Sequence, residues 1–174
     1  LPRFNYALSL VDDGRYGTTG NGDGKPDVGE LVAIEVDVKN RGEGPTREAF
    51  VRLKNRSGRA LDLRVGSIEI GDPKDAEGEP CVPDSVGCIR SLPAGANQVG
   101  HVLFELRALP ESGEWNLEVV LGDNRAYDYA SVQRGGFFDY FQLEEELVLK
   151  PGEELPSYTR APPVIEVTRV PDEL

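Results

Sequence analysis

The stretch TTGNGDGKPDVGE, residues 18–30, places oxygen-bearing side chains and glycines at a spacing that suits a hard cation. A twelve-residue calcium loop supplies ligands from positions 1, 3, 5, 7, 9 and 12 and has glycine at position 6. Counted from Thr19, the expected ligands are Thr19, Asn21, Asp23, the backbone carbonyl of Lys25, Asp27 and Glu30, with Gly24 sixth. Three carboxylates so close together repel one another, and a dication relieves that repulsion. The sequence therefore predicts a calcium site.

Two features of this stretch depart from the usual calcium loop. Thr19 offers a neutral hydroxyl where an aspartate is usual, and Asp12 or Asp13 is the alternative first ligand. Pro26 occupies the eighth position, and a β-type run instead of a helix follows Glu30. We therefore expect an isolated structural site of the weaker, extracellular kind. The competing interpretation is an acidic turn that binds no metal.

Two cysteines, Cys81 and Cys88, lie in a loop rich in Pro, Gly and Asp. Six intervening residues allow a disulfide ring, and such bridges persist in oxidising compartments. The alternative is a pair of free thiols, but a loop without other ligands favours the disulfide. Zinc is not expected because His101 is the only histidine, and it lies within an alternating strand pattern typical of a structural residue.

Residues 127–141 concentrate much of the aromatic content of the chain. If Tyr127, Tyr129 and Tyr140 are exposed, they could stack on sugar rings, as in a carbohydrate-binding module. If they are packed, they belong to the core and to a docking surface for a neighbouring domain, which is the interpretation we favour.

Composition excludes several classes of partner. The chain has 174 residues, 39% of them hydrophobic, and a formal net charge of -12. This charge repels nucleic acid and anionic lipid, and no apolar run approaches the length of a membrane helix. The chain begins at Leu1 and contains no methionine, so we expect either a cut piece or a processed product, from which a targeting signal could have been removed. We expect no nucleic-acid partner and no membrane insertion.

Strand signals dominate the sequence. Period-two alternation recurs over residues 4–10, 31–40, 49–55, 59–71, 101–106 and 114–121, separated by Gly, Pro, Asn and Asp clusters. Gly66 interrupts the fourth run. This pattern predicts an all-β fold, an immunoglobulin-like antiparallel sandwich of seven to nine strands. We expect the sandwich over residues 1–150, a Pro/Glu-rich linker over 151–163, and an edge strand or the start of a neighbouring domain over 164–174.

Residues 3–150 resemble the accessory β-sandwich of deltaproteobacterial carboxyl-terminal processing (tail-specific) serine proteases. The resemblance is carried by NGDG at residues 21–24, GE at 29–30, VKNRGEG at 38–44 and LKNRSG at 53–58, with LPAGANQVGHVLFELR and WNLEVVLGDNRAYDYAS further on. It implies a periplasmic or extracellular domain beside a protease core that uses a Ser and Lys pair. No stretch of this chain offers that pair with a peptide-binding domain, so we expect the chain itself not to be an enzyme.

Together these observations lead to one leading hypothesis and two alternatives. The leading hypothesis is a calcium-stabilised accessory domain that contacts neighbouring domains of its own chain or another envelope protein. The first alternative is a carbohydrate-binding module that recognises a glycan through residues 127–141. The second is an enzyme in its own right.

Overall fold

The computed structural model describes residues 4–46, 48–123, 142–156 and 158–160 of the chain. Their regular elements are β-strands, apart from two short 3-10 turns, η1 (Arg15–Gly17) and η2 (Gly58–Ala60). In chain order the strands are β1 (Phe4–Val11), β2 (Leu31–Asn40), β3 (Ala49–Asn55), β4 (Leu61–Val65), β5 (Ser67–Ile70), β6 (Asp72–Lys74), β7 (Ile89–Ser91), β8 (Asn97–Leu106), β9 (Trp115–Asp123), β10 (Gln142–Leu149) and β11 (Tyr158–Arg160). Within the described ranges, no helix is long and apolar enough to cross a membrane.

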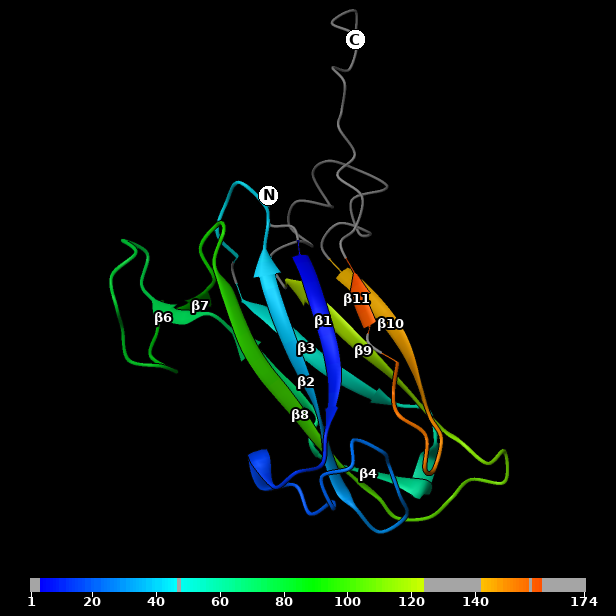
Figure 1. Ribbon diagram of the computed structural model, residues 1–174. Helices are drawn as coiled ribbons and strands as arrows, with labels where there is room; N and C mark the ends of the chain where they lie inside the picture. Colours follow the sequence, from blue (N-terminus) through cyan, green and yellow to red (C-terminus); the bar gives the residue numbers. More distant parts are fainter. Residues whose placement is uncertain (1–3, 47, 124–141, 157, 161–174) are drawn as a thin grey trace, which may run out of the picture.

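Two antiparallel sheets form the sandwich. One has the order β11-β1-β2-β8-β4 and the other β10-β9-β3-β5 (Figure 1). The series β1-β2-β8-β4 matches the A-B-E-D sheet of an immunoglobulin-like domain, and β10-β9-β3 matches its G-F-C sheet. The predicted fold class is therefore confirmed, with nine strands in the two main sheets of the described chain. A separate hairpin, β6-β7, projects from the side of the sandwich (Figure 1).

The alternation seen in the sequence determines which side chains face the core. In β2, Val32, Ile34, Val36 and Val38 are fully buried, whereas Asp37 on the same strand is exposed. Full burial of each such aliphatic side chain contributes roughly 1.5–3 kcal/mol. The equivalent buried residues of the other long strands are Phe4, Tyr6, Leu8, Ala49, Val51, Leu53, Val102, Phe104, Leu106, Trp115, Leu117, Val119 and Leu121.

Gly66 marks the point at which the chain changes sheets. β4 ends at Val65 and pairs with β8, whereas β5 begins at Ser67 and pairs with β3 in the opposite sheet. The backbone N–H of Leu53 donates to the Gly66 carbonyl at 2.8 Å, which fixes the bend against β3. The interruption expected at Gly66 from the sequence is therefore present.

Four of the described strands were not expected from the sequence. β10 lies beyond the last alternating run found in the sequence and includes the run of glutamates at residues 144–146, a composition more typical of a solvated face. The β6-β7 hairpin lies in the loop expected to be irregular. β11 falls inside the segment expected to be a linker and pairs with β1. Residues 164–174 lie outside the described residues.

Candidate metal centre

The acidic loop, residues 12–30, connects β1 to β2 at one end of the sandwich (Figure 1). Its neck is tied by the Thr19 N–H, which donates to the Leu31 carbonyl at 2.9 Å. The Gly29 N–H donates to the carbonyl of Leu106 in β8 at 2.6 Å, and the Gly152 N–H donates to the Pro26 carbonyl at 3.0 Å. The loop is therefore attached to the core on several sides.

Within the loop, side-chain oxygens wind the backbone into successive tight turns. Asn21 Oδ1 accepts from the Asp23 N–H at 3.1 Å, and Asp23 Oδ1 accepts from the Lys25 N–H at 2.9 Å. Gly22 and Gly24 have φ values of 80° and 74°, which side chains with a Cβ rarely adopt. The sixth-position glycine expected from the calcium-loop pattern therefore adopts the left-handed backbone expected of it.

Asp12, directly after β1, is the most deeply buried acidic residue of the loop. It is 2% exposed. Its Oδ1 accepts a hydrogen bond from the Gly24 N–H at 3.0 Å, and its backbone carbonyl accepts from the Gly22 N–H at 3.0 Å. Its other carboxylate oxygen, Oδ2, is buried and has no hydrogen-bond partner. A buried carboxylate oxygen without a partner is costly, and a proton or a cation bound there would remove that cost.

Glu30 borders the same space. Its Oε1 is also buried without a partner. A Cβ added at Gly20 would lie 2.5 Å from Asp12 Cβ and 2.8 Å from Glu30 Oε2. Both acidic side chains therefore pack against Gly20, and only glycine leaves room for them.

The carboxyl groups of the loop influence one another electrostatically. Burial is the main cause that raises the pKa of Asp12. The hydrogen bond from the Gly24 N–H lowers this pKa, and the nearby Asp23 carboxyl raises it. Burial also raises the pKa of Glu30, with added repulsion from Asp12 and Asp23. The Lys25 N–H is the main cause that lowers the pKa of Asp23. The loop thus accumulates negative charge that its own groups do not neutralise.

The donor types fit calcium. Among the described residues, no group of three or more His, Cys, Asp or Glu side chains is arranged to hold a metal by itself. Calcium, however, takes six to eight oxygens from carboxylates, amides and backbone carbonyls together. Asp12, Asp23 and Glu30 would supply carboxylates, and Asn21 and the Lys25 carbonyl would supply neutral oxygens. These three carboxylates are not already grouped as a metal site in the structure, so calcium binding would have to draw them together.

The sequence-predicted ligands differ in their surroundings. Thr19 is exposed, and its Oγ1 accepts from the Leu31 N–H at 2.9 Å. Asp27 is exposed, and its Oδ1 accepts from the adjacent Val28 N–H at 2.8 Å. The structure brings Asp23 and Glu30 into electrostatic contact with Asp12, which the sequence offered only as an alternative to Thr19. The sequence feature that could have indicated Asp12 as a buried residue of this site is its position directly after the strand β1.

The turn η1 extends the loop over the outer face of the sheet. Tyr16 stacks on His101 of β8 with ring centroids 4.0 Å apart and planes 11° apart. The Tyr16 hydroxyl donates to Glu35 Oε2 at 3.0 Å, and Arg15 Nη1 pairs with the same oxygen at 3.2 Å. His101 therefore has a structural contact, as its strand pattern indicates.

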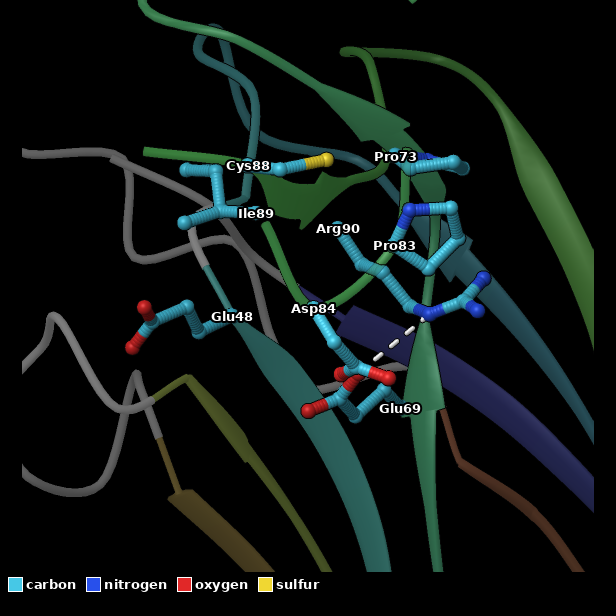
Figure 2. A pocket seen from close by; sticks show the side chains of 8 residues that line it. All are labelled: Glu48, Glu69, Pro73, Pro83, Asp84, Cys88, Ile89 and Arg90. Carbon is cyan, nitrogen blue, oxygen red and sulfur yellow. Dashed lines mark ion pairs between the residues drawn. The ribbon is translucent and has the colours of Figure 1, made fainter. Parts of the chain in front are cut away.

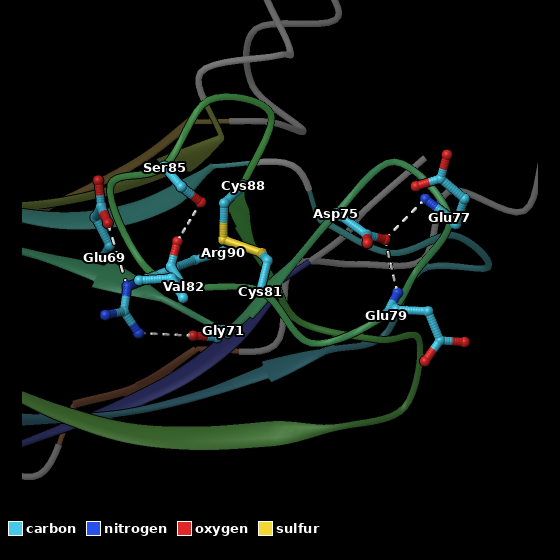
Figure 3. The surroundings of a disulfide bond; sticks show 10 residues. All are labelled: Glu69, Gly71, Asp75, Glu77, Glu79, Cys81, Val82, Ser85, Cys88 and Arg90. Atoms are coloured by element: carbon cyan, nitrogen blue, oxygen red, sulfur yellow. Dashed lines mark hydrogen bonds and ion pairs between the residues drawn. A yellow bond between two sulfur atoms is a disulfide. The ribbon is translucent and has the colours of Figure 1, made fainter.

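The disulfide predicted in the second loop is present. Cys81 and Cys88 are bonded, with Cα atoms 5.8 Å apart (Figure 3). Asp75 Oδ1 accepts from the N–H groups of Glu77 and Glu79, each at 2.9 Å, so the rest of the hairpin loop is also internally hydrogen-bonded.

A pocket of about 230 Å³ lies beside this hairpin (Figure 2). Glu48, Glu69 and Asp84 contribute carboxylates to its lining, and Arg90 contributes the positive charge. Arg90 Nε pairs with Glu69 at 3.2 Å, and Arg90 Nη1 donates to the Gly71 carbonyl at 3.3 Å. The guanidinium is therefore already engaged, and the carboxylates around it, two of them exposed, define no ligand.

Comparison with known proteins assigns no family. No protein-family model matches the chain, and no curated protein sequence matches it. A solved structure titled "AvmM Catalyzes Macrocyclization in Alchivemycin A Biosynthesis" aligns with a TM-score of 0.42 and 15% identity, over 86% of this chain and 91% of that chain. A likeness at this level assigns no activity to this chain.

One expectation from the sequence is corrected at this point. The chain was expected not to be an enzyme, but the solved structure that it partly resembles is, by its title, that of an enzyme. The expectation of a non-enzyme is therefore withdrawn. Tyr127, Tyr129 and Tyr140 lie outside the described residues, so the glycan-binding alternative stays a prediction.

Proposed function

We propose that this chain is a calcium-stabilised, immunoglobulin-like accessory domain of a secreted or periplasmic multidomain protein. Its role is to position neighbouring domains or to recognise a partner. The resemblance of residues 3–150 favours a carboxyl-terminal processing serine protease as the parent protein.

One observation carries the calcium assignment. Asp12 Oδ2 and Glu30 Oε1 are buried without partners in a loop whose turns and charges suit a hard cation. Calcium in this loop would link the end of β1 to the start of β2, so it would stabilise the sandwich directly.

The disulfide supports the location. Bridges such as Cys81–Cys88 are rare in the reducing cytosol and frequent in secreted and periplasmic proteins. Extracellular calcium is millimolar, which is the range that suits a weak loop site.

The test is thermal unfolding and calorimetric titration of the whole chain in calcium and in chelator. Calcium at about 100 times its Kd should stabilise the fold by about 2.7 kcal/mol. For a domain of this size each kcal/mol raises Tm by roughly 2–4 °C. Asp23→Ala should weaken calcium binding and reduce the Tm shift.

Asp37→Ala is the matched control, because Asp37 is an exposed aspartate on the outer face of β2, away from the loop. It should keep the full calcium response. A wild-type chain whose Tm and heat of titration are the same in millimolar calcium and in chelator would rule out the calcium assignment.

A further inference from the structure

Asp12 lies outside the twelve-residue stretch that the calcium-loop pattern counts, yet it reaches the middle of that stretch. The Gly24 N–H donates to Asp12 Oδ1, and the Gly22 N–H donates to the Asp12 carbonyl, each at 3.0 Å. The end of β1 is therefore hydrogen-bonded to the two glycines on either side of Asp23. The residues between Asp12 and Thr19 form an excursion that includes η1.

The partners of the two oxygens of Asp12 differ sharply. Oδ1 is satisfied by a backbone N–H, whereas Oδ2 is buried and accepts nothing. Asp13, its neighbour, is largely exposed, and both of its oxygens lie 3.1 Å from Arg15 Nε. Of these two alternatives to Thr19, only Asp12 has a buried oxygen without a hydrogen-bond partner, and its carboxyl group interacts with that of Asp23.

Thr19 is poorly placed for the role that the sequence pattern gives it. Its Oγ1 accepts the N–H of Leu31 while its own N–H donates to the Leu31 carbonyl, so both groups are held against the first residue of β2. These two bonds close the neck of the loop, which is a structural task.

We propose that Asp12, and not Thr19, is the first carboxylate ligand of the cation, so that the site joins β1 to the 21–30 loop. This inference rests on the proposed function. The remaining ligands are Asp23, Glu30, the Asn21 amide and the Lys25 carbonyl. The site is thus discontinuous in sequence, and Gly20 provides the space in which Asp12 and Glu30 meet.

The experiment compares calcium titrations of wild type, Asp12→Asn, Asp13→Asn and Thr19→Val, each after removal of bound metal with a chelator. Asp12→Asn keeps an oxygen for the Gly24 N–H but removes the charge, and it should weaken the Kd for calcium at least about tenfold. Asp13→Asn changes the net charge equally and should stay within about threefold of wild type. Thr19→Val should also bind within about threefold.

Thermal unfolding in chelator separates a ligand from a structural residue. Because Asp12→Asn removes a buried negative charge that no cation neutralises in chelator, its Tm in chelator should equal or exceed that of wild type. In calcium its Tm should be lower than that of wild type. An equal loss of Tm in both conditions would make Asp12 structural and overturn the proposal.

Two further outcomes are distinguishable. If Thr19→Val abolishes binding while Asp12→Asn binds as wild type does, the ligand assignment is wrong and the calcium-stabilised domain stands. If wild type itself binds no calcium at millimolar concentration, both proposals fail together.

Discussion

The acidic loop, residues 12–30, and the disulfide hairpin, residues 72–91, are both acidic segments outside the two main sheets, but they are stabilised differently. The hairpin is closed covalently, and Asp75 accepts two backbone N–H groups at its tip. Val82 and Val86 are 73% and 106% exposed, so the hairpin adds no core there. Its polar groups are satisfied internally or by solvent.

The acidic loop instead buries one of its carboxylates, Asp12, against the core and half-buries another, Glu30. Asp12 and Thr18 are nearly inaccessible, and backbone hydrogen bonds tie the loop to β2 and β8. Two buried carboxylate oxygens remain without partners. A change in the hairpin should therefore stay local, whereas a change in the acidic loop should affect the whole sandwich.

The largest expected effect comes from Gly20→Ala. The new Cβ would lie 2.6 Å from the Asp12 carbonyl oxygen and 2.5 Å from Asp12 Cβ, neither of which can move without shifting the end of β1. Overpacking of this kind costs about 1–3 kcal/mol. We expect the calcium-dependent Tm shift to disappear as well, as measured by thermal unfolding in calcium and in chelator.

Gly66→Ala is the matched control for this substitution. A Cβ at Gly66 would lie 3.3 Å from Leu63 Cδ1, the end of a flexible side chain that can move. Its calcium response should be complete. An undiminished calcium response in Gly20→Ala would show that the cation does not occupy the space between Asp12 and Glu30.

A smaller, local effect is expected when the disulfide is removed with Cys81→Ser/Cys88→Ser. Because the bridge closes so short a loop, the loss of entropy in the unfolded chain raises the free energy of unfolding by at most about 2.5 kcal/mol. The hairpin projects from the sandwich, so we expect less than this in global stability and a large increase in amide hydrogen exchange over residues 75–88. The Kd for calcium should not change.

The matched comparison is wild type under mild reduction, which breaks the same bond without substitution. The two samples should agree in hydrogen exchange. A loss of calcium binding in either sample would contradict the independence of the two regions.

The strands of the sandwich were predictable because burial on one face imposes period-two alternation, as in Val32, Ile34, Val36 and Val38. β10 was missed for a physical reason as well. Leu147 and Leu149 face the core, but Glu145 on the same strand accepts a hydrogen bond from the Tyr6 hydroxyl at 3.0 Å. Glu145 therefore occupies an inward position without being apolar, so the alternation of apolar and polar residues along β10 cannot be seen in the sequence.

The candidate metal centre was predictable only in part. Asn21, Gly24 and Glu30 follow a contiguous spacing, which a sequence pattern can detect. The burial of Asp12 depends on how β1 and the loop meet in space, and an excursion that includes Tyr16 separates it from the pattern. Spacing along a chain therefore indicates a loop of the right chemistry but does not identify every oxygen that reaches its centre.

The smallest expected effect is a pH dependence of opposite sign at two acidic residues of the loop. Burial raises the pKa of Glu30, whereas the N–H and guanidinium of Arg15 lower the pKa of Asp13. In chelator, Glu30 therefore contributes stability that is present at low pH and is lost as pH rises through its raised pKa. Asp13 contributes stability that is present above its unfolded pKa and is lost as pH falls.

The measurement is urea unfolding between about pH 3 and pH 8 in chelator, for wild type, Glu30→Gln and Asp13→Asn. In the unfolded chain, aspartate and glutamate have pKa values of about 3.9 and 4.3. Relative to Glu30→Gln, wild type should lose stability as pH rises. Relative to Asp13→Asn, it should gain stability. Calcium should reduce the first slope and leave the second unchanged, because the cation neutralises buried charge and Asp13 is already paired with Arg15. Two slopes of the same sign in chelator would mean that Glu30 is solvated like Asp13. The acidic loop would then not differ from the disulfide hairpin, whose polar groups are satisfied by hydrogen bonds or solvent.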